Sequence, residues 1–434
     1  MKVSYYSLGC KVNEYESVAI INEFMDNGFE LVGFQEKADV AIINTCTVTN
    51  TSDSKSRKII RQAVKNNQNG VVAVMGCFAQ LNPLQVKEIE GVDIILGTKN
   101  RHLLYSLAID ALKTKNPKFI IEDISKNRDY EEIKINRYNN HTRGFIKIED
   151  GCDNFCSYCA IPYARGRVRS RLPEDVINEI SHLSQNGMKE VVLTGINTGA
   201  YGKDLNGYSF ENLLSDLVSR VDNLPRIRIS SLEMTEITDG LLNIINVHKD
   251  KFCNHFHIPL QGGANNTLKR MNRKYTTEEY KEKINKIRNV FPDANITTDV
   301  MVGFPGETAS DFEETKKFID SINYGEMHVF PYSRRPNTRA YDFVDQVDDI
   351  TKKFRTNELL NLSREKAIEF RKQFVGKRVE VLVEKVQNGI CYGHSSNYLN
   401  VKFESITAKN NDLVLVELTD YNYPISSGKE IINV

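Results

Sequence analysis

Short apolar runs alternate with amphipathic stretches through the amino-terminal quarter of the chain. The apolar runs have the length of strands and contain no charged residue, a pattern typical of parallel strands buried on both faces. They span residues 3–8, 40–43 and 71–75. The stretches between them, residues 14–27 and 52–65, repeat apolar positions with the helical period. The pattern predicts an α/β fold with an open parallel sheet.

A helical pattern over residues 101–113 completes this first unit, which we expect to form a domain of residues 1–115. Residues 116–143 follow, and they are crowded with charged residues and asparagine. Within them, only residues 119–124 have the pattern of a strand. Such a composition indicates a segment that connects two domains.

The alternation of strand and helix patterns resumes at residue 144 and continues to residue 374. The strand-length runs in this region span residues 145–148, 191–194, 226–230, 255–259, 296–302 and 327–330. Six such units predict a partial (β/α)6 barrel, open on one side to a large substrate. In a barrel of this kind the active site lies at the carboxyl ends of the strands.

After a helical pattern over residues 352–374, the period of the apolar positions changes to two. Val379, Val381 and Val383 begin this region, and the runs that follow span residues 390–394, 399–403, 413–418 and 430–434. Five short strands predict a small antiparallel β-barrel over residues 375–434. Small barrels of this kind often hold RNA, and a purely structural appendage is the alternative.

The composition indicates a cytoplasmic protein of two or three domains. The chain has 434 residues, 40% of them hydrophobic, and no apolar run is long enough to cross a membrane. We therefore expect no membrane partner. The net charge is zero, which gives no global signal for nucleic acid, and we expect no DNA partner.

Basic residues gather in three places beside loops that carry glycine or proline. Each group alone is typical of a solvated surface, but together they could line a groove for phosphates. The groups are Arg165, Arg167, Arg169 and Arg171; Lys269, Arg270, Arg273 and Lys274; and Arg334, Arg335 and Arg339.

Three cysteines, Cys152, Cys156 and Cys159, lie within one short segment. Their spacing lets a single loop wrap one inorganic centre. Three thiolates suit a four-iron cube with one iron left open for a substrate or cofactor, whereas a structural site is normally closed by four ligands. A zinc knuckle is the alternative, but no nearby Cys or His completes a tetrahedral set at the usual spacing.

Three further cysteines, Cys10, Cys46 and Cys77, each follow the carboxyl end of a predicted strand. In an open α/β sheet these ends face one crevice, so the fold would bring the thiols together into a second cluster site. Three scattered buried thiols are the alternative, although buried thiols favour strand interiors. Thiols that serve metals fit a reducing compartment. Cys253 and Cys391 fall outside this pattern, and we expect small buried thiols there.

With these motifs, the chain resembles the radical S-adenosylmethionine (SAM) methylthiotransferases over essentially its full length. The cysteine loop, with Tyr158 before its last cysteine, resembles the signature of radical SAM enzymes. Residues 9–13, 44–49 and 163–171 resemble the branch that acts on N6-threonylcarbamoyladenosine in tRNA. The resemblance implies an amino-terminal cluster domain, a radical SAM barrel and a carboxyl-terminal TRAM-like barrel.

The family's chemistry gives each cysteine triad a role. The resemblance implies two [4Fe–4S] clusters. The Cys152, Cys156 and Cys159 cluster would bind SAM and, when reduced, cleave it to a 5′-deoxyadenosyl radical. The Cys10, Cys46 and Cys77 cluster would hold methylated sulfur for insertion at C2 of the adenine next to the anticodon. Loops around four residues would shape the SAM pocket, with Tyr158 near the adenine of SAM: Gly195, Glu233, Gln261 and Gly303. No catalytic residue is expected beyond the clusters.

A threonylcarbamoyl group carries a carboxylate and a hydroxyl, so its pocket should offer cationic or hydrogen-bonding partners. We expect at least one of Arg165, Arg167 and Arg169 to meet that carboxylate.

The expected partners are tRNA and an electron donor of the flavodoxin or ferredoxin type. The alternatives are a methylthiotransferase for isopentenyladenosine tRNA or for a ribosomal-protein aspartate, another radical SAM enzyme, and a non-catalytic iron–sulfur protein that binds RNA.

Overall fold

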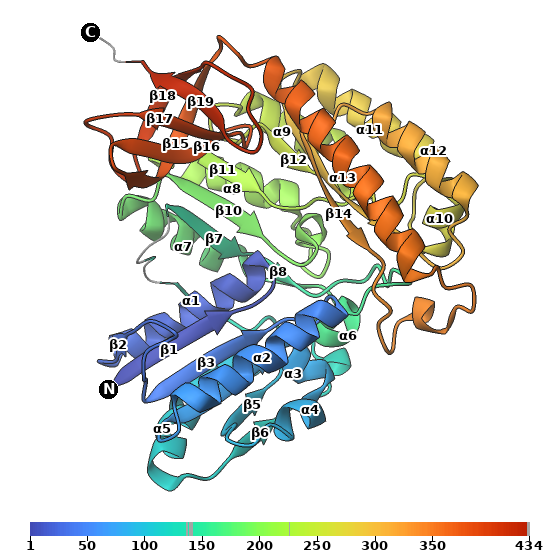
Figure 1. The fold of residues 1–434 in the computed structure, drawn as a ribbon. Coiled ribbons are helices and arrows are strands. Elements are labelled where there is room, and N and C mark those ends of the chain that lie inside the picture. The colour runs from blue at the N-terminus through green and yellow to red at the C-terminus, as the bar shows by residue number, and fades with distance from the viewer. Residues whose placement is uncertain (136–137, 139–141, 225, 432–434) are drawn as a thin grey trace.

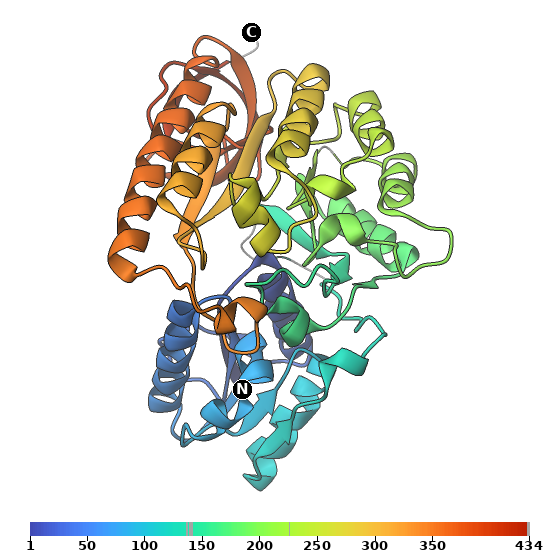
Figure 2. The same cartoon turned by 90° about the vertical axis from the view of Figure 1, so that its right-hand side faces the viewer.

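The computed structural model describes residues 1–135, 138, 142–224 and 226–431. Its three parts lie in a row, with the barrel of parallel strands between the amino-terminal α/β domain and the small carboxyl-terminal barrel (Figures 1 and 2). Within the described ranges, every helix is too short or too polar to cross a bilayer.

The amino-terminal domain is a parallel six-stranded sheet in the order β2-β1-β3-β4-β5-β6. The strands are β1 (Lys2–Ser7), β2 (Glu30–Leu31), β3 (Val40–Thr45), β4 (Val71–Gly76), β5 (Ile94–Leu96) and β6 (Lys118–Ile120). The helices are α1 (Lys11–Asp26), α2 (Asn50–Asn66), α3 (Cys77–Leu81), α4 (Pro83–Lys87) and α5 (Leu104–Thr114). The three predicted strands and the predicted helices are confirmed.

Both faces of this sheet are covered, which explains why its central strands are apolar throughout. Helices α1 and α5 pack on one face, and α2 and α3 pack on the other. Strand β6 pairs in parallel with β5, so the first sheet extends past residue 115 into the segment expected to connect the domains. The remainder of that segment includes residues 136–137 and 139–141, which lie outside the described residues.

The central barrel is built from the six predicted strands. They are β7 (Arg143–Lys147), β10 (Glu190–Thr194), β11 (Arg226–Ile229), β12 (His255–His257), β13 (Asn295–Val302) and β14 (Glu326–Pro331). They form two parallel three-stranded sheets, β11-β10-β7 and β12-β13-β14. Isolated bridges from Ile227 to Phe252 and from Ser231 to His257 join the two sheets between β11 and β12. The prediction of a partial barrel is confirmed.

Helices surround the outside of the barrel and bury its outward-facing side chains in one large core. They are α7 (Pro173–Gln185), α8 (Phe210–Arg220), α9 (Asp239–Val247), α10 (Asn265–Arg270), α11 (Thr277–Val290), α12 (Ala309–Asp320) and α13 (Asp349–Lys372). Helix α6 (Ile161–Arg165), which follows the cysteine loop, packs against α3 of the amino-terminal domain instead. Serine and threonine caps with their partners three residues later begin α8, α11 and α12. A short antiparallel pair, β8 (Glu149–Asp150) with β9 (Arg169–Ser170), brackets the cysteine loop.

The carboxyl-terminal part is a closed five-stranded barrel in the order β15-β16-β17-β19-β18. Its strands are β15 (Arg378–Gln387), β16 (Ile390–Ser395), β17 (Asn400–Glu404), β18 (Leu413–Leu418) and β19 (Ser426–Glu430). One pair, β17 with β19, is parallel, and the other neighbours are antiparallel.

The last strand ends where we expected it to begin. The apolar run 430–434 predicted a strand, but β19 is made of the preceding small and polar residues, and 432–434 lie outside the described residues. The strand forms there because β17 and β18 both supply backbone partners, which period-two apolarity does not reveal.

Candidate active site

The cysteines at the three strand ends of the first sheet are brought together by close contacts between loops. Gly9 has φ +112°, and a side-chain Cβ at this position would lie 3.2 Å from Cys46 Sγ. Glycine therefore allows the loop that carries Cys10 to approach Cys46. Cys77 begins α3 directly after β4. The three thiols interact electrostatically with one another.

Asn13 in the first turn of α1 joins these loops. Its amide donates to Leu8 O at 2.7 Å and to Thr45 O at 3.1 Å, and its Oδ1 accepts from the guanidinium of Arg165 at 2.8 Å. Cys10 Sγ lies 3.5 Å from the same Oδ1. One side chain therefore connects two cysteine loops of the first domain to the barrel.

The second triad lies on the loop between β8 and α6. Cys152 N donates to Gly166 O at 3.0 Å, and Cys159 N donates to Cys156 O at 2.9 Å. Asn272 Nδ2 donates to Phe155 O at 3.1 Å, which fixes the middle of the loop against the barrel. Hydrogen bonds from the protein itself therefore help to hold the loop in its fold.

The buried thiols of both triads resist ionisation. Burial raises the pKa of Cys77 and of Cys159 to about 12. Burial also raises the pKa of Cys46 and of Cys152. A thiolate in these positions needs a bound cation, as metal ligation provides.

The spacing of the thiols decides between one metal ion and a cluster. Among the described residues, neither triad has its sulfur atoms all within 4.8 Å of one another. Sulfur ligands of a single zinc ion, at about 2.3 Å from the metal in tetrahedral geometry, would lie about 4 Å apart. Thiols spaced more widely than this suit the larger [4Fe–4S] cube with one iron left open better than a single zinc ion.

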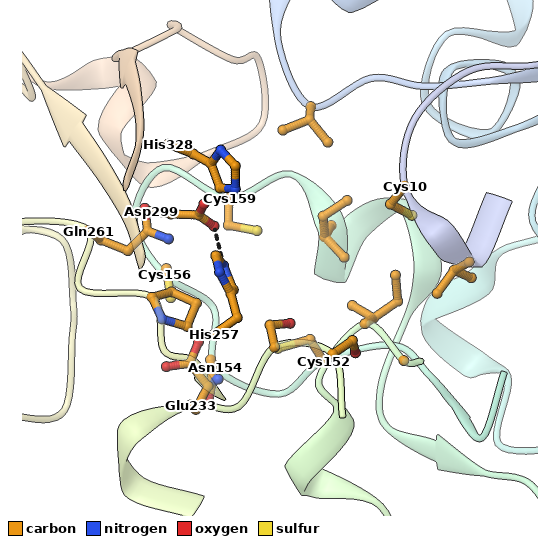
Figure 3. Close-up of a pocket in the computed structure, with 18 of the residues that line it drawn as sticks. Cys10, Cys152, Asn154, Cys156, Cys159, Glu233, His257, Gln261, Asp299 and His328 are labelled. Carbon is orange, nitrogen blue, oxygen red and sulfur yellow. Dashed lines mark ion pairs between the residues drawn. The ribbon is translucent and has the colours of Figure 1, made fainter. Parts of the chain in front are cut away.

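One cavity of 840 Å³ receives residues of both triads (Figure 3). Cys10 lies on one side, and the loop of Cys152, Cys156 and Cys159 forms another part of the wall. The cavity is within the range of volumes that hold small ligands and cofactors, at its upper end. Two centres held by these cysteines would therefore act on the same bound molecule.

Four of the residues expected in the SAM pocket line this cavity: Tyr158, Gly195, Glu233 and Gln261. Gln261 is buried, and its Oε1 has no hydrogen-bond partner among the residues that the structure describes, as expected of a group that awaits a ligand. Gly303 is not among the lining residues. It forms the turn after β13 with φ +68°, and the side chain of Lys352 fills the space beside it.

Arg273 is a site residue that we had predicted only as one member of a basic group. Its Nη1 lies 3.4 Å from Cys156 Sγ and donates to Glu233 Oε1 at 3.2 Å. Glu233 thus holds a cation against the cysteine loop. Two other arginines of the basic groups are also paired: Arg270 with Asp345, and Arg335 with Asp53.

The interior of the barrel under the cysteine loop is polar on the side of β12, β13 and β14. His257 Nε2 lies 3.3 Å from Asp299 Oδ2, and His328 stands beside them (Figure 3). We had not predicted these residues. A signal was present, because His255, His257, Thr297 and Asp299 occupy alternate positions of two strands that should be buried.

The predicted arginines do not stand together in the cavity. Arg165 and Arg169 are fully buried in a network of ion pairs with Glu16 and Asp150. Arg165 Nη1 lies 2.9 Å from Glu16 Oε1 and 3.0 Å from Asp150 Oδ1. Arg167 alone is half exposed, 3.2 Å from Asp153 and over the ring of Phe155.

The small barrel also reaches this cavity. Tyr398, between β16 and β17, lines it and stacks on His255 with ring centroids 4.8 Å apart. Arg228 of β11 donates to the carbonyls of Ser395 and Ser396 at 3.2 and 3.0 Å. The carboxyl-terminal barrel is therefore fixed to the amino-terminal end of the central barrel and closes its interior.

Comparisons with known proteins agree with this site. The model of the radical SAM superfamily matches residues 146–319, and that of uncharacterized protein family UPF0004 matches residues 2–97. The chain is 42% identical to the threonylcarbamoyladenosine tRNA methylthiotransferase MtaB of Bacillus subtilis (strain 168), with 98% of this chain and 96% of that protein covered. The chain belongs to the radical SAM methylthiotransferases. In this methylthiotransferase, the two matched regions each contain one cysteine triad.

Two further relatives show how the family divides. The MtaB of Aquifex aeolicus (strain VF5) is 38% identical, with 93% of this chain and 97% of that protein covered. The tRNA-2-methylthio-N(6)-dimethylallyladenosine synthase of Thermoanaerobacter pseudethanolicus is 37% identical, with 88% and 82% covered. The MtaB relatives are therefore only slightly more identical to this methylthiotransferase than the dimethylallyladenosine synthase is.

A solved structure agrees with the fold of this methylthiotransferase. The radical SAM methyltransferase TsrM from Kitasatospora setae, with cobalamin and a [4Fe–4S] cluster bound, aligns with a TM-score of 0.56 at 15% identity. The alignment covers 90% of this chain and 81% of that chain. At this identity the likeness concerns the fold alone.

Proposed function

We propose that this enzyme inserts a methylthio group at C2 of N6-threonylcarbamoyladenosine, next to the anticodon of tRNA. The observation that carries the proposal is one cavity lined both by Cys10 of the amino-terminal triad and by Cys152, Cys156 and Cys159. Sulfur insertion needs a hydrogen-abstracting centre and a sulfur-donating centre at one carbon atom. Two cluster sites on one cavity meet that requirement.

The residues of the barrel loop would hold the first [4Fe–4S] cluster through Cys152, Cys156 and Cys159. When bound and reduced, such a cluster with SAM at its open iron supplies the radical chemistry that side chains cannot supply. Around it, Glu233 and Arg273 place paired charges beside the cysteine loop, and Gln261 offers a free amide oxygen to the cofactor. Tyr158 forms an aromatic wall against Phe304.

Cys10, Cys46 and Cys77 would hold the second cluster. Gly9 and Asn13 hold the loops of this triad close together, and Arg165 connects Asn13 to Asp150 of the barrel. The chain thereby fixes the distance between the two cluster sites. The electrons would come from a flavodoxin or ferredoxin, and a tRNA would present the base at the cavity mouth.

Anaerobic reconstitution tests the proposal. The purified enzyme, with reductant, SAM and a sulfur source, should convert threonylcarbamoyladenosine in tRNA to its 2-methylthio derivative and release 5′-deoxyadenosine. Nucleoside mass spectrometry measures the first product and chromatography the second. A preference for isopentenyladenosine tRNA would move the enzyme to the other branch. Release of 5′-deoxyadenosine without a sulfur-containing nucleoside would contradict the methylthiotransferase assignment for this substrate.

A further inference from the structure

The two branches of relatives differ only slightly in overall identity, so we looked for the choice of base in the side chains of the cavity. The distinguishing feature of a threonylcarbamoyl group is its carboxylate. In adenine, only N1 separates C2 from the carbon that carries N6. When C2 lies at the sulfur-donating centre, the N6 substituent must therefore enter the same cavity.

The lining of the cavity offers two permanent cations, Lys11 and Arg273. Arg273 is already paired with Glu233. Lys11 has no ion pair among the described residues, and it directly follows Cys10, a predicted ligand of the sulfur-donating cluster. Arg165 and Arg169, the arginines expected to meet the carboxylate, already have buried carboxylate partners.

The position of Lys11 suits an anion that enters between the triads. Lys11 is the first residue of α1, so its backbone is fixed by the helix. Its side chain is accessible, and the accessible surface faces the cavity. On the barrel side, where Tyr398 lines the cavity, Arg143 and Arg228 are already paired with Glu384 and Glu190.

We infer that Lys11 is the specificity-determining residue that binds the carboxylate of the threonylcarbamoyl group, and this inference rests on the proposed function. An isopentenyl group has no charge to offer this lysine. With the apolar substituent, the ammonium would be partly desolvated without a partner, which disfavours that base. The same residue therefore attracts one substrate and rejects the other.

The test compares two anticodon stem-loops, one with threonylcarbamoyladenosine and one in which its carboxylate is a primary amide. Wild-type enzyme should favour the carboxylate. Lys11→Met and Lys11→Gln should lose about 10- to 100-fold in kcat/KM on the carboxylate substrate, as expected for a charge-assisted hydrogen bond, and little on the amide. Lys11→Arg should recover part of the loss. Lys113→Met, which removes an exposed lysine of α5 far from the cavity lining, is the matched control.

Two readouts separate this role from a structural one. Bound iron and 5′-deoxyadenosine release without RNA should equal those of the wild type in every Lys11 variant. An unchanged ratio of carboxylate to amide activity in Lys11→Met would overturn the inference, and so would equal losses on both substrates. If Arg167→Met, and not Lys11→Met, abolished the preference for the carboxylate over the amide, Arg167 would be the residue that binds the carboxylate. That result would also overturn the inference. If the wild type modifies neither stem-loop, the proposed function fails, and the inference fails with it.

Discussion

The triad of Cys152, Cys156 and Cys159 comes from one loop, whereas Cys10, Cys46 and Cys77 come from three strand ends of one sheet. The first is held by backbone hydrogen bonds within the loop and to its neighbours. The second exists only when the sheet and its connections are complete. Two sites with the same ligands therefore depend on the fold in different ways.

This difference predicts how each cysteine site responds to substitutions elsewhere in the protein. A change far from the barrel loop leaves its three cysteines within reach of one another. A change in the first sheet, or in the side chains that join its loops, moves Cys10 relative to Cys46 and Cys77. The amino-terminal site should be the more sensitive of the two to distant substitutions.

The largest effect is expected when the loop triad is removed. Replacing Cys152, Cys156 and Cys159 by Ala should leave about four of about eight irons and abolish both 5′-deoxyadenosine release and sulfur insertion. Iron analysis and product chromatography measure these quantities. Sulfur insertion by this variant would show that the loop triad is not the radical centre.

Removal of the other triad should abolish sulfur insertion without abolishing SAM cleavage. Replacing Cys10, Cys46 and Cys77 by Ala should also halve the iron and abolish sulfur insertion, but 5′-deoxyadenosine release should persist, because the loop triad is intact. The same two measurements apply. If SAM cleavage vanished while half of the iron remained, the proposed division of labour would be wrong.

Much of this arrangement could be predicted from the sequence, because the rules that place it are local. The three spaced cysteines need only a loop. The strand-end position of Cys10, Cys46 and Cys77 follows from apolar runs and the geometry of parallel sheets. Strands β2 and β5 were not predicted because they are short. The last strand, β19, was predicted too late in the chain because its residues are small and polar.

The arginine run shows where sequence reasoning fails. Arg165 and Arg167 belong to the same basic run, yet one is buried and the other half exposed. The burial of Arg165 depends on Glu16, 149 residues away in the chain. No period or spacing reveals such a partner, so a run of charge looks like a surface until the fold is known.

These two arginines offer the next test of the comparison. Arg165→Met should destabilise the protein by about 3–5 kcal/mol, because it leaves Glu16 and Asp150 buried with one cation fewer. It should also lower iron at the amino-terminal site, since Asn13 loses its partner. Denaturant unfolding and iron analysis measure these changes.

Arg167→Met is the matched control for stability, and it should cost less than about 1 kcal/mol because its ion pair is exposed. Similar unfolding curves for the Arg165 and Arg167 variants would contradict the structural role of the buried network. Iron loss from the loop triad, rather than from the sheet triad, would contradict the greater sensitivity of the latter.

The smallest effect is expected from one methyl group beside Cys46. Gly9 and Gly28 both have positive φ, +112° and +84°, so alanine at either position should cost about 1–3 kcal/mol of backbone strain. Only at Gly9 would the new Cβ crowd a neighbour, 3.1 Å from Cys46 Cβ, whereas nothing lies within 4 Å at Gly28. Gly9→Ala should therefore reduce sulfur insertion and amino-terminal iron, and Gly28→Ala should reduce stability alone. Equal iron in the two variants would show that the sheet triad accommodates displacement as readily as the loop triad does.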